Sequence, residues 1–201
     1  MRKVNIGLVG CGTVGSGVVQ ALARNGALMG SRLGVKLSLG KVAVRNPRKA
    51  RAARLAKRLV TDDWESLVRD PKIDVVVELM GGTTIARKVV NEALKLGKPV
   101  VTANKALISA HGESIFKLVE KNGGNLYYEA AVAGGIPIIK SLREGLSGNR
   151  IQRLYGILNG TCNYILTQME AEGRDFEDIL FNKLFVKVLS FNKFLFEIST
   201  S

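Results

Sequence analysis

The chain has 201 residues, of which 46% are hydrophobic and 23% charged, and it contains 22 glycines. This length and composition are typical of one globular domain, or of one domain with part of a second. No run of about 18 apolar residues occurs, so we expect no membrane span, and we expect no signal peptide because the N-terminal segment lacks a long apolar region. With two cysteines in different motifs, we expect neither a disulfide framework nor a metal knuckle, and a cytoplasmic location.

The formal charge of +13 raises the question of a phosphate-rich partner. The segment from Lys41 to Arg58 concentrates lysines and arginines and contains no acid. One interpretation is a solvated helix face, and the other is a site for one extra phosphate at the start of the segment. Neither aromatic residues interleaved with the charge nor a helix-turn-helix pattern accompanies it, so we expect no nucleic-acid partner.

In chain order, strands and helices alternate through the first two thirds of the sequence. We predict strands over 4–9, 41–44, 73–79, 99–102 and 126–132, and helices around 18–23, from Pro47, after Thr61–Asp63, over 86–96 and over 113–121. This alternation predicts an α/β fold, a Rossmann-type parallel sheet with helices on both faces.

From about Ile136 the pattern changes. We predict a helix over 138–146, a strand over 151–158, a helix over 161–172 and a further helix start at Asp175. The domain organisation that follows is a dinucleotide-binding domain over residues 1–135 and the start of a truncated α+β substrate-binding and dimerisation domain over 136–180.

Residues 181–201 form an atypical tail. They hold five of the seven phenylalanines and no Gly, Ala, Arg or Asp, and they follow neither a helical period nor a strand-turn pattern. An unusual buried helix is one interpretation. We favour the other, a non-native end such as one produced by a frameshift.

A glycine-rich motif, Gly10-x-Gly12-x-x-Gly15, follows the first predicted strand and opens the first predicted helix. The first glycine permits a tight turn, the second leaves room for a pyrophosphate, and the third lets the helix pack closely on the strand. The free amides and the dipole at the helix start favour the anion. The motif in this context predicts dinucleotide binding.

The residue after the second predicted strand usually selects the form of the dinucleotide. An acid there binds the ribose hydroxyls of NAD, whereas a base accommodates the 2′-phosphate of NADP. Arg45 holds this position, with Arg48 and Lys49 near it and no competing acid. The pattern favours NADP(H) and leaves NAD(H) as the alternative, because an arginine also stacks on adenine.

Two more segments follow predicted strands, at the edge where such sheets bind ligands. Gly81 and Gly82 would let a flat nicotinamide ring lie against the backbone, with a plain turn as the alternative. Lys105, which follows Thr102 and Asn104, would bind an oxygen anion or polarise a carbonyl. The alternative for this lysine is an ordinary surface charge.

Single residues elsewhere suggest no further chemistry. We expect His111, the only histidine, in a loop or at a helix cap, and Trp64 in the core or at an interface.

Five blocks, in this order and spacing, give the chain a specific resemblance: GLVGCGTVG, VVELMGG, VVTANKALIS, YYEAAVAGGIPII and GILNGTCNYIL. Over residues 1–180 the chain resembles homoserine dehydrogenases. The resemblance implies the reversible reduction of L-aspartate 4-semialdehyde to L-homoserine with NADPH or NADH, on the route to threonine, methionine and isoleucine. It also implies a homodimer.

The resemblance assigns roles to matched positions, with Lys105 as the catalytic residue. It implies cofactor contacts at Gly10, Gly12, Thr13, Val14, Gly15, Arg45, Gly81, Gly82, Thr102 and Lys105, substrate contacts at Asn159, Gly160 and Thr161, and a monovalent cation, sodium or potassium, at Glu129, Val132, Gly134 and Ile136. Backbone carbonyls would hold such an ion, because it prefers hard oxygen donors.

The chain departs from the family after Leu180. The family continues to a substrate-binding glutamate, an Asp-Pro segment and a Gly-x-Asp-x-x-x-Lys element whose lysine transfers the proton, whereas here Glu197 is the only later acid. Loss of a positioned general acid costs about 10²–10⁴ in rate. We therefore expect a truncated, weakly active or inactive homoserine dehydrogenase. A non-catalytic NADP(H)-binding protein or partner subunit is the alternative.

Overall fold

The computed structural model describes residues 1–46, 55–156, 160–176, 178–179 and 196–200. The chain divides into two compact units, Met1–Val132 and Ala133–Ser201. The helix predicted from Pro47 and most of the tail lie outside the described residues. No helix in the described part combines the length and the apolar character needed to cross a membrane.

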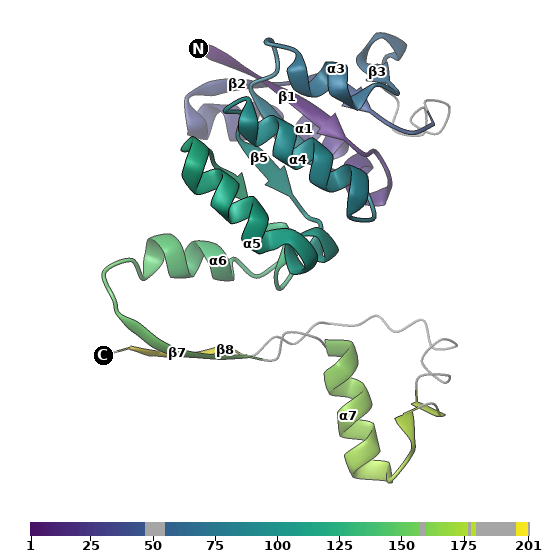
Figure 1. The fold of residues 1–201 in the computed structure, drawn as a ribbon, viewed down its shortest axis with the longest axis vertical. Coiled ribbons are helices and arrows are strands. Elements are labelled where there is room, and N and C mark those ends of the chain that lie inside the picture. Colours follow the sequence, from purple (N-terminus) through teal and green to yellow (C-terminus); the bar gives the residue numbers. More distant parts are fainter. Residues whose placement is uncertain (47–54, 157–159, 177, 180–195, 201) are drawn as a thin grey trace. The chain divides into compact units, whose positions relative to one another are not determined.

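The first unit alternates strands and helices along the chain (Figure 1). Its elements are β1 (Arg2–Val9), α1 (Thr13–Leu33), β2 (Val35–Ala43), η2 (Lys57–Leu59), β3 (Val60–Thr61), α3 (Trp64–Arg69), β4 (Val75–Glu78), α4 (Thr84–Lys95), β5 (Val100–Thr102), α5 (Lys105–Asn122), β6 (Leu126–Tyr127) and η3 (Glu129–Ala131). The strands form one sheet in the order β3-β2-β1-β4-β5-β6, and every neighbouring pair is parallel. The predicted Rossmann-type sheet is confirmed.

Helices cover both faces of this sheet. On one face, α3, α4 and α5 bury a cluster that includes Leu67, Leu94 and Leu107, while on the other face Val19 of α1 packs with Leu8 and other strand residues. Figure 1 shows α4 and α5 lying across the same side of the strands. Burial of both faces explains why β4 is a continuous β-branched run ending in Glu78 rather than an alternating strand.

Two glycines let residues outside the sheet, Leu67 of α3 and Ile73 of the loop before β4, approach the strands closely. A Cβ on Gly7 of β1 would lie 2.7 Å from Leu67 Cδ2, and a Cβ on Gly40 of β2 would lie 2.7 Å from Ile73 Cδ1. The pairing of β1 with β2 also shifts here, because Ile6 faces Leu39 whereas Gly7 faces Lys41. Gly40 is therefore the extra residue of a bulge, a position that favours glycine.

Three predicted boundaries in this unit are wrong. The second strand begins at Val35 rather than residue 41, because Gly34 ends α1 in the left-handed conformation with φ 67° and leads straight into β2. Helix α5 begins at Lys105 rather than residue 113, so His111 lies inside a helix and not in a loop or cap. The strand predicted over 126–132 ends at Tyr127, where the turn η3 begins with Ala131 N donating to Tyr128 O at 2.9 Å.

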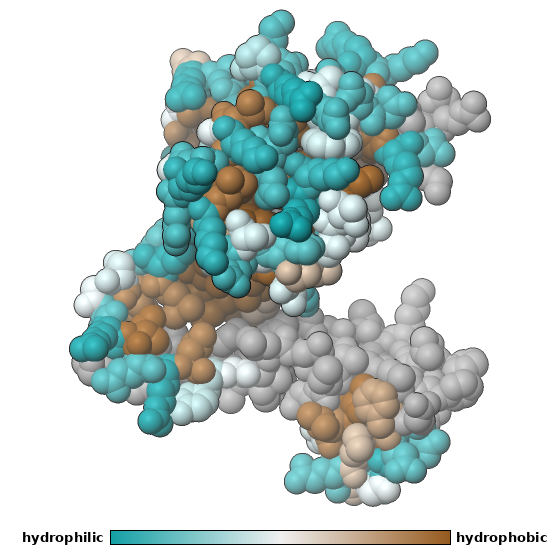
Figure 2. Space-filling model, in the orientation of Figure 1, coloured by the Kyte–Doolittle hydropathy of each residue, from teal (hydrophilic) through white to brown (hydrophobic). Residues whose placement is uncertain are grey.

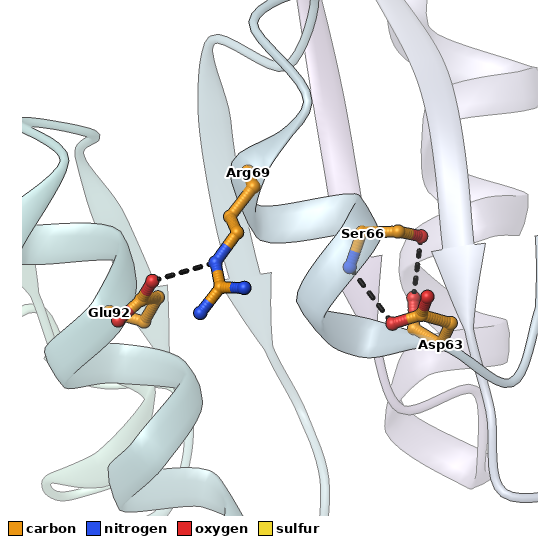
Figure 3. A network of polar contacts seen from close by, with 4 residues as sticks. All are labelled: Asp63, Ser66, Arg69 and Glu92. Carbon is orange, nitrogen blue, oxygen red and sulfur yellow. Dashed lines mark hydrogen bonds and ion pairs between the residues drawn. The ribbon is translucent and has the colours of Figure 1, made fainter.

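The start of α3 agrees with the sequence. Asp63 caps the helix: its side chain accepts from Ser66 N at 2.9 Å, and Ser66 Oγ donates to the Asp63 carbonyl (Figure 3). At the other end of α3, Arg69 Nε lies 2.9 Å from Glu92 Oε1 and ties the helix to α4. The Glu92 carboxylate raises the pKa of Arg69 through this hydrogen bond, but the guanidinium is exposed, so the pair adds little to stability.

Replacing the cap gives a simple test of this arrangement. Asp63→Ala should lower the free energy of unfolding by about 0.5–2 kcal/mol, because the first turn of α3 loses its side-chain acceptor. Chemical denaturation measures the loss. Asp62→Ala is the matched control, since the neighbouring acid is exposed and makes no cap, and an equal loss in both variants would contradict the assignment.

The second unit contains α6 (Ile138–Lys140), η4 (Ser141–Gly145), β7 (Ile151–Gly156), α7 (Gly160–Glu172) and β8 (Phe196–Thr200). The strand β8 pairs antiparallel with β7, with Ile151 facing Thr200 and Gly156 facing Phe196. The last residues of the tail thus form a strand although their sequence shows no strand-turn pattern. A strand of this kind is defined by its partner rather than by its own period.

The described residues of this unit leave several large apolar side chains exposed, among them Leu154, Tyr155, Leu166 and Phe176. Figure 2 shows apolar surface in this part of the chain. On the first unit, the face in Figure 2 is instead mostly polar, with scattered apolar residues, which is the usual condition of a folded surface.

Candidate functional site

A cavity of about 410 Å³ opens at the carboxyl edge of the sheet in the first unit. The segments that follow four adjacent strands form its walls, and one residue of α4 joins them: Val9–Gly12, Ala43–Asn46, Asp62, Trp64, Met80, Gly81 and Ile85. In the sheet order, β1 and β4 are neighbours, with β2 on the other side of β1 and β5 on the other side of β4. The chain therefore continues from β1 to one side of the sheet and from β4 to the opposite side. Ligands of open α/β sheets bind at this switch point.

The turn from β1 to α1 has the geometry that its glycines predict. Gly10 has φ +97°, and a Cβ there would lie 2.6 Å from Leu79 O. A Cβ on Gly15 would overlap the carbonyl oxygen of Gly10, so this glycine lets α1 pack on the turn. At Gly12, by contrast, a Cβ would meet nothing within 4 Å. The packing of the protein itself therefore does not require a glycine at residue 12.

The N-terminus of α1 is suited to an anion. Gly12 is the N-cap, no side chain caps the helix, and the first turn contains no acid. The first amides of the helix therefore have no side-chain acceptor, and together with the helix dipole they favour a negatively charged ligand. The empty space at Gly12 and the uncapped amides fit a pyrophosphate group.

The far wall of the cavity combines charges of both signs. Arg45, which the sequence predicts here, and Asn46 follow β2, while Asp62 and Trp64 follow β3. The expectation that no acid competes at this end is wrong, because the fold brings Asp62 into the wall. Trp64 packs against the core, as predicted, and also lines the cavity. Arg48 and Lys49 lie outside the described residues.

Sequence reasoning missed Asp62 and Trp64 as wall residues for one reason. The strand β3 has only two residues and is defined by its pairing with Val42 and Ala43 of β2, so no local sequence pattern predicts it. Once β3 is known to lie beside β2, the residues after it are expected at the carboxyl edge.

Behind the cavity wall lies a buried polar network. Glu78 and Thr102 are fully buried, and Asn104 is nearly so. Thr102 Oγ1 donates to Glu78 Oε2 at 2.6 Å, and Met80 N donates to Glu78 Oε1 at 2.8 Å. Asn104 Nδ2 donates to Gly82 O at 2.8 Å and to Met80 O at 3.3 Å. The network thus holds the turn after β4 against the start of α5.

Burial raises the pKa of Glu78 above its ordinary value of 4.5, and the hydrogen bonds from Thr102 and Met80 offset part of this rise. The folded chain therefore binds this proton more tightly than the unfolded chain does. The resulting contribution to stability is fully present below pH 4.5 and is lost as the pH rises through the folded-state pKa.

The other predicted cofactor residues lie around this edge without lining the cavity. Thr13 opens α1 and Val14 follows it, largely exposed. The Thr102 hydroxyl is occupied by Glu78, and it also accepts from Asn104 N at 3.0 Å. Lys105, the predicted catalytic residue, is the exposed first residue of α5, directly after the Asn104 cap.

The residues predicted to bind the substrate and the cation are divided between the two units. Asn159 lies outside the described residues, and Gly160 and Thr161 begin α7. In the first unit, Val132 N donates to Glu129 O at 3.1 Å, within the turn after η3. In the second unit, Ile136 N donates to Ala133 O at 2.9 Å, just beyond Gly134. Within the described residues, no group of three or more His, Cys, Asp or Glu side chains could hold a metal ion.

Comparison with known proteins identifies two family regions. The profile for "Homoserine dehydrogenase, NAD binding domain" matches residues 10–129, and the profile for "Homoserine dehydrogenase" matches residues 137–183. Homoserine dehydrogenase from Pseudomonas aeruginosa is 46% identical over 180 residues, which cover 90% of this chain and 41% of that protein. The first unit is accordingly a nicotinamide-dinucleotide-binding domain of this family.

Solved structures agree. A homoserine dehydrogenase from Thiobacillus denitrificans has a TM-score of 0.79 at 47% identity, over 90% of this chain and 42% of that one. A hyperthermophilic archaeal homoserine dehydrogenase in complex with NADPH has a TM-score of 0.71 at 25% identity, over 95% of this chain and 63% of that one.

The chain spans about two fifths of the length of the bacterial relatives it matches. Within that span, the profile matches, the sequence identity and the fold agree with the geometry of the glycine-rich turn. The chain belongs to the homoserine dehydrogenase family.

Proposed function

We propose that the cavity of the first unit binds NADP(H) in preference to NAD(H). The observation that carries dinucleotide binding is the combination of open space at Gly12 with the uncapped start of α1, at the switch point of the sheet, and the one that carries the preference is Arg45 in the cavity wall. The complex of the archaeal relative with NADPH supports it. When bound, the nicotinamide supplies a hydride to a carbonyl carbon or takes one back.

In this proposal each wall of the cavity binds one part of the dinucleotide. Arg45 pairs with the 2′-phosphate, and the turn at Gly81 and Gly82 lies against the nicotinamide side. The pyrophosphate lies over the start of α1, at Gly10, Gly12, Thr13, Val14 and Gly15. Thr102, whose side chain is buried, shapes this edge from behind, and Lys105 orients the substrate oxygen.

The cofactor preference rests on Arg45. Arg45→Ala should weaken NADPH binding about tenfold, because a charge-assisted contact to the 2′-phosphate is lost, and should leave NADH binding nearly unchanged. Titration followed by Trp64 fluorescence measures both affinities, since the only tryptophan lines the cavity. Asp62→Asn is the matched variant of opposite charge: it removes a negative charge from the same wall and should strengthen NADPH binding relative to NADH binding. Equal losses of NADPH and NADH in Arg45→Ala would contradict the preference.

For the whole protein we propose the family's reaction, reduction of L-aspartate 4-semialdehyde to L-homoserine in threonine, methionine and isoleucine synthesis, in the cytoplasm. Residues 1–135 would form the cofactor domain and residues 136–180 part of the substrate and dimerisation domain. Asn159, Gly160 and Thr161 would contact the substrate. A sodium or potassium ion would lie at the carbonyls of Glu129, Val132, Gly134 and Ile136, and the protein would be a homodimer.

The 201-residue chain by itself should bind cofactor and turn over slowly. After Leu180 the sequence offers no counterpart to the family's Gly-x-Asp-x-x-x-Lys element, and loss of a positioned general acid costs about 10²–10⁴ in rate. Oxidation of NADPH with aspartate semialdehyde, measured beside a full-length relative, tests this. Turnover at the relative's level would contradict the slow reaction, and failure to bind NADPH would contradict the proposed site.

A further inference from the structure

We propose that Glu78 is a positioning residue for the cofactor site, whose buried carboxylate fixes the turn Met80–Gly82, in which Met80 and Gly81 form part of the cavity wall. The inference rests on the proposed function, since it assumes that this wall faces the nicotinamide half of a bound dinucleotide. Glu78 itself does not line the cavity. It would act through the turn that follows β4.

The buried polar side chains of the first unit lie together, at the ends of β4 and β5. Glu78, Thr102 and Asn104 are the only polar residues that are buried in the described part of the chain. They come from two adjacent strands and the following helix cap, and they are bonded to one another in a chain, Glu78 to Thr102 and Thr102 to Asn104. Interiors normally exclude such groups, since their burial costs free energy unless every polar atom is paired.

Stability does not explain why a carboxylate stands here. Replacing a buried ion pair by apolar residues of similar size often leaves a protein equally or more stable, and burying a single carboxylate likewise costs free energy. The β4 run Val75–Val77 shows that apolar residues suit this strand, and the run changes character only at Glu78, where the strand ends at the cavity edge. A buried carboxylate at that point is better explained by its hydrogen bonds to the turn after β4 and to Thr102.

The bonds of this network end on the cavity wall. Glu78 Oε1 accepts from the backbone amide of Met80, and Asn104 donates to the carbonyls of Met80 and Gly82. Both the amide and the carbonyl of Met80 are therefore fixed from behind. Gly82, at φ +78°, would otherwise leave this turn free to change conformation. The network leaves the front of Met80 and Gly81 available to the cavity.

Two ligands separate this role from a general effect on folding. In the proposed binding mode NADPH would contact both walls of the cavity, whereas 2′,5′-ADP, which lacks the nicotinamide half, would contact the wall of Arg45, Asp62 and Trp64 and the start of α1. Glu78→Met removes both acceptor oxygens and should weaken NADPH binding about tenfold, on the scale of one lost charge-assisted hydrogen bond. Binding of 2′,5′-ADP should change by less than about twofold, because a distant wall is unaffected.

Glu78→Gln is the conservative variant. It keeps one oxygen for the Met80 amide but loses the charge, so it should recover most of the NADPH affinity and retain a loss of about two- to threefold. If Glu78→Met does not fold, this loss for NADPH, without a matching loss for 2′,5′-ADP, decides the question. Val100→Ala is the matched control, because Val100 is fully buried on the adjacent strand β5 and does not line the cavity. It should lower stability without changing the ratio of the NADPH and 2′,5′-ADP affinities.

Amide exchange tests the clamp without any ligand. In Glu78→Met the Met80 amide loses its acceptor, so its exchange should accelerate relative to the neighbouring strand amides. Unchanged NADPH affinity in both Glu78 variants, or equal losses for NADPH and 2′,5′-ADP, would overturn the positioning role. A wild-type chain that binds neither ligand would overturn the proposed function instead, and normal Met80 exchange in Glu78→Met would overturn the clamp itself.

Discussion

Gly12→Ala is expected to remove most NADPH binding while leaving the fold intact. A Cβ at this position meets nothing within 4 Å, and the backbone has φ −80°, which any residue adopts. The space that the methyl group would fill is the space proposed for the pyrophosphate. A methyl group forced into a close-packed contact costs about 1–3 kcal/mol, so we expect the affinity to fall about ten- to a hundredfold.

The neighbouring Gly10 gives the opposite expectation. Gly10→Ala places a Cβ 2.6 Å from Leu79 O on a backbone with φ +97°, so it should lower the free energy of unfolding by more than about 2 kcal/mol. Gly26→Ala, inside α1 with open space around its Cβ, should instead raise stability by about 0.5–1 kcal/mol and leave binding alone. Titration calorimetry and chemical denaturation measure the two effects. A normal NADPH affinity in Gly12→Ala would place the pyrophosphate elsewhere.

The sequence predicts those parts of the fold that a local pattern encodes. The β-branched run of β4, the apolar spacing of Ala86, Val89, Val90, Ala93 and Leu94 in α4, and the Asp63 cap each lie within one segment. The start of β2, the two residues of β3 and the strand β8 are defined by partners far along the chain. No local period distinguishes them, which is why their prediction failed.

The same distinction applies to the site. Gly10, Gly12 and Gly15 act within one turn, so their spacing along the chain is enough to predict their roles. Asp62 reaches the cavity only because β3 pairs with β2. The Glu78 network joins residues 24 positions apart in sequence, and neither Glu78 nor Thr102 shows in its own segment that the other is its partner.

The second large effect expected concerns the contact between Gly7 and Leu67. Gly7→Ala would place a Cβ 2.7 Å from Leu67 Cδ2 and 2.9 Å from Ile73 Cγ2, which overpacks the core and should cost about 1–3 kcal/mol. Leu67→Ala empties a fully buried site and should cost about 2–5 kcal/mol. In the double variant the new methyl group occupies part of the space that Leu67 leaves. The two losses should therefore not add, with a coupling of about 0.5–3 kcal/mol.

This contact also reaches the cavity, because Trp64 is three residues before Leu67 on the same helix, α3. Overpacking at Gly7 should move α3 away from the sheet and carry Trp64 with it, so Gly7→Ala should alter the Trp64 emission and weaken binding of 2′,5′-ADP. Leu107→Ala in α5 is the control: it is equally buried, and its combination with Gly7→Ala should be additive. Full additivity of Gly7→Ala with Leu67→Ala, measured by denaturation, would show that α3 does not rest on Gly7. The glycine in β1 would then have no part in setting the wall that Trp64 forms.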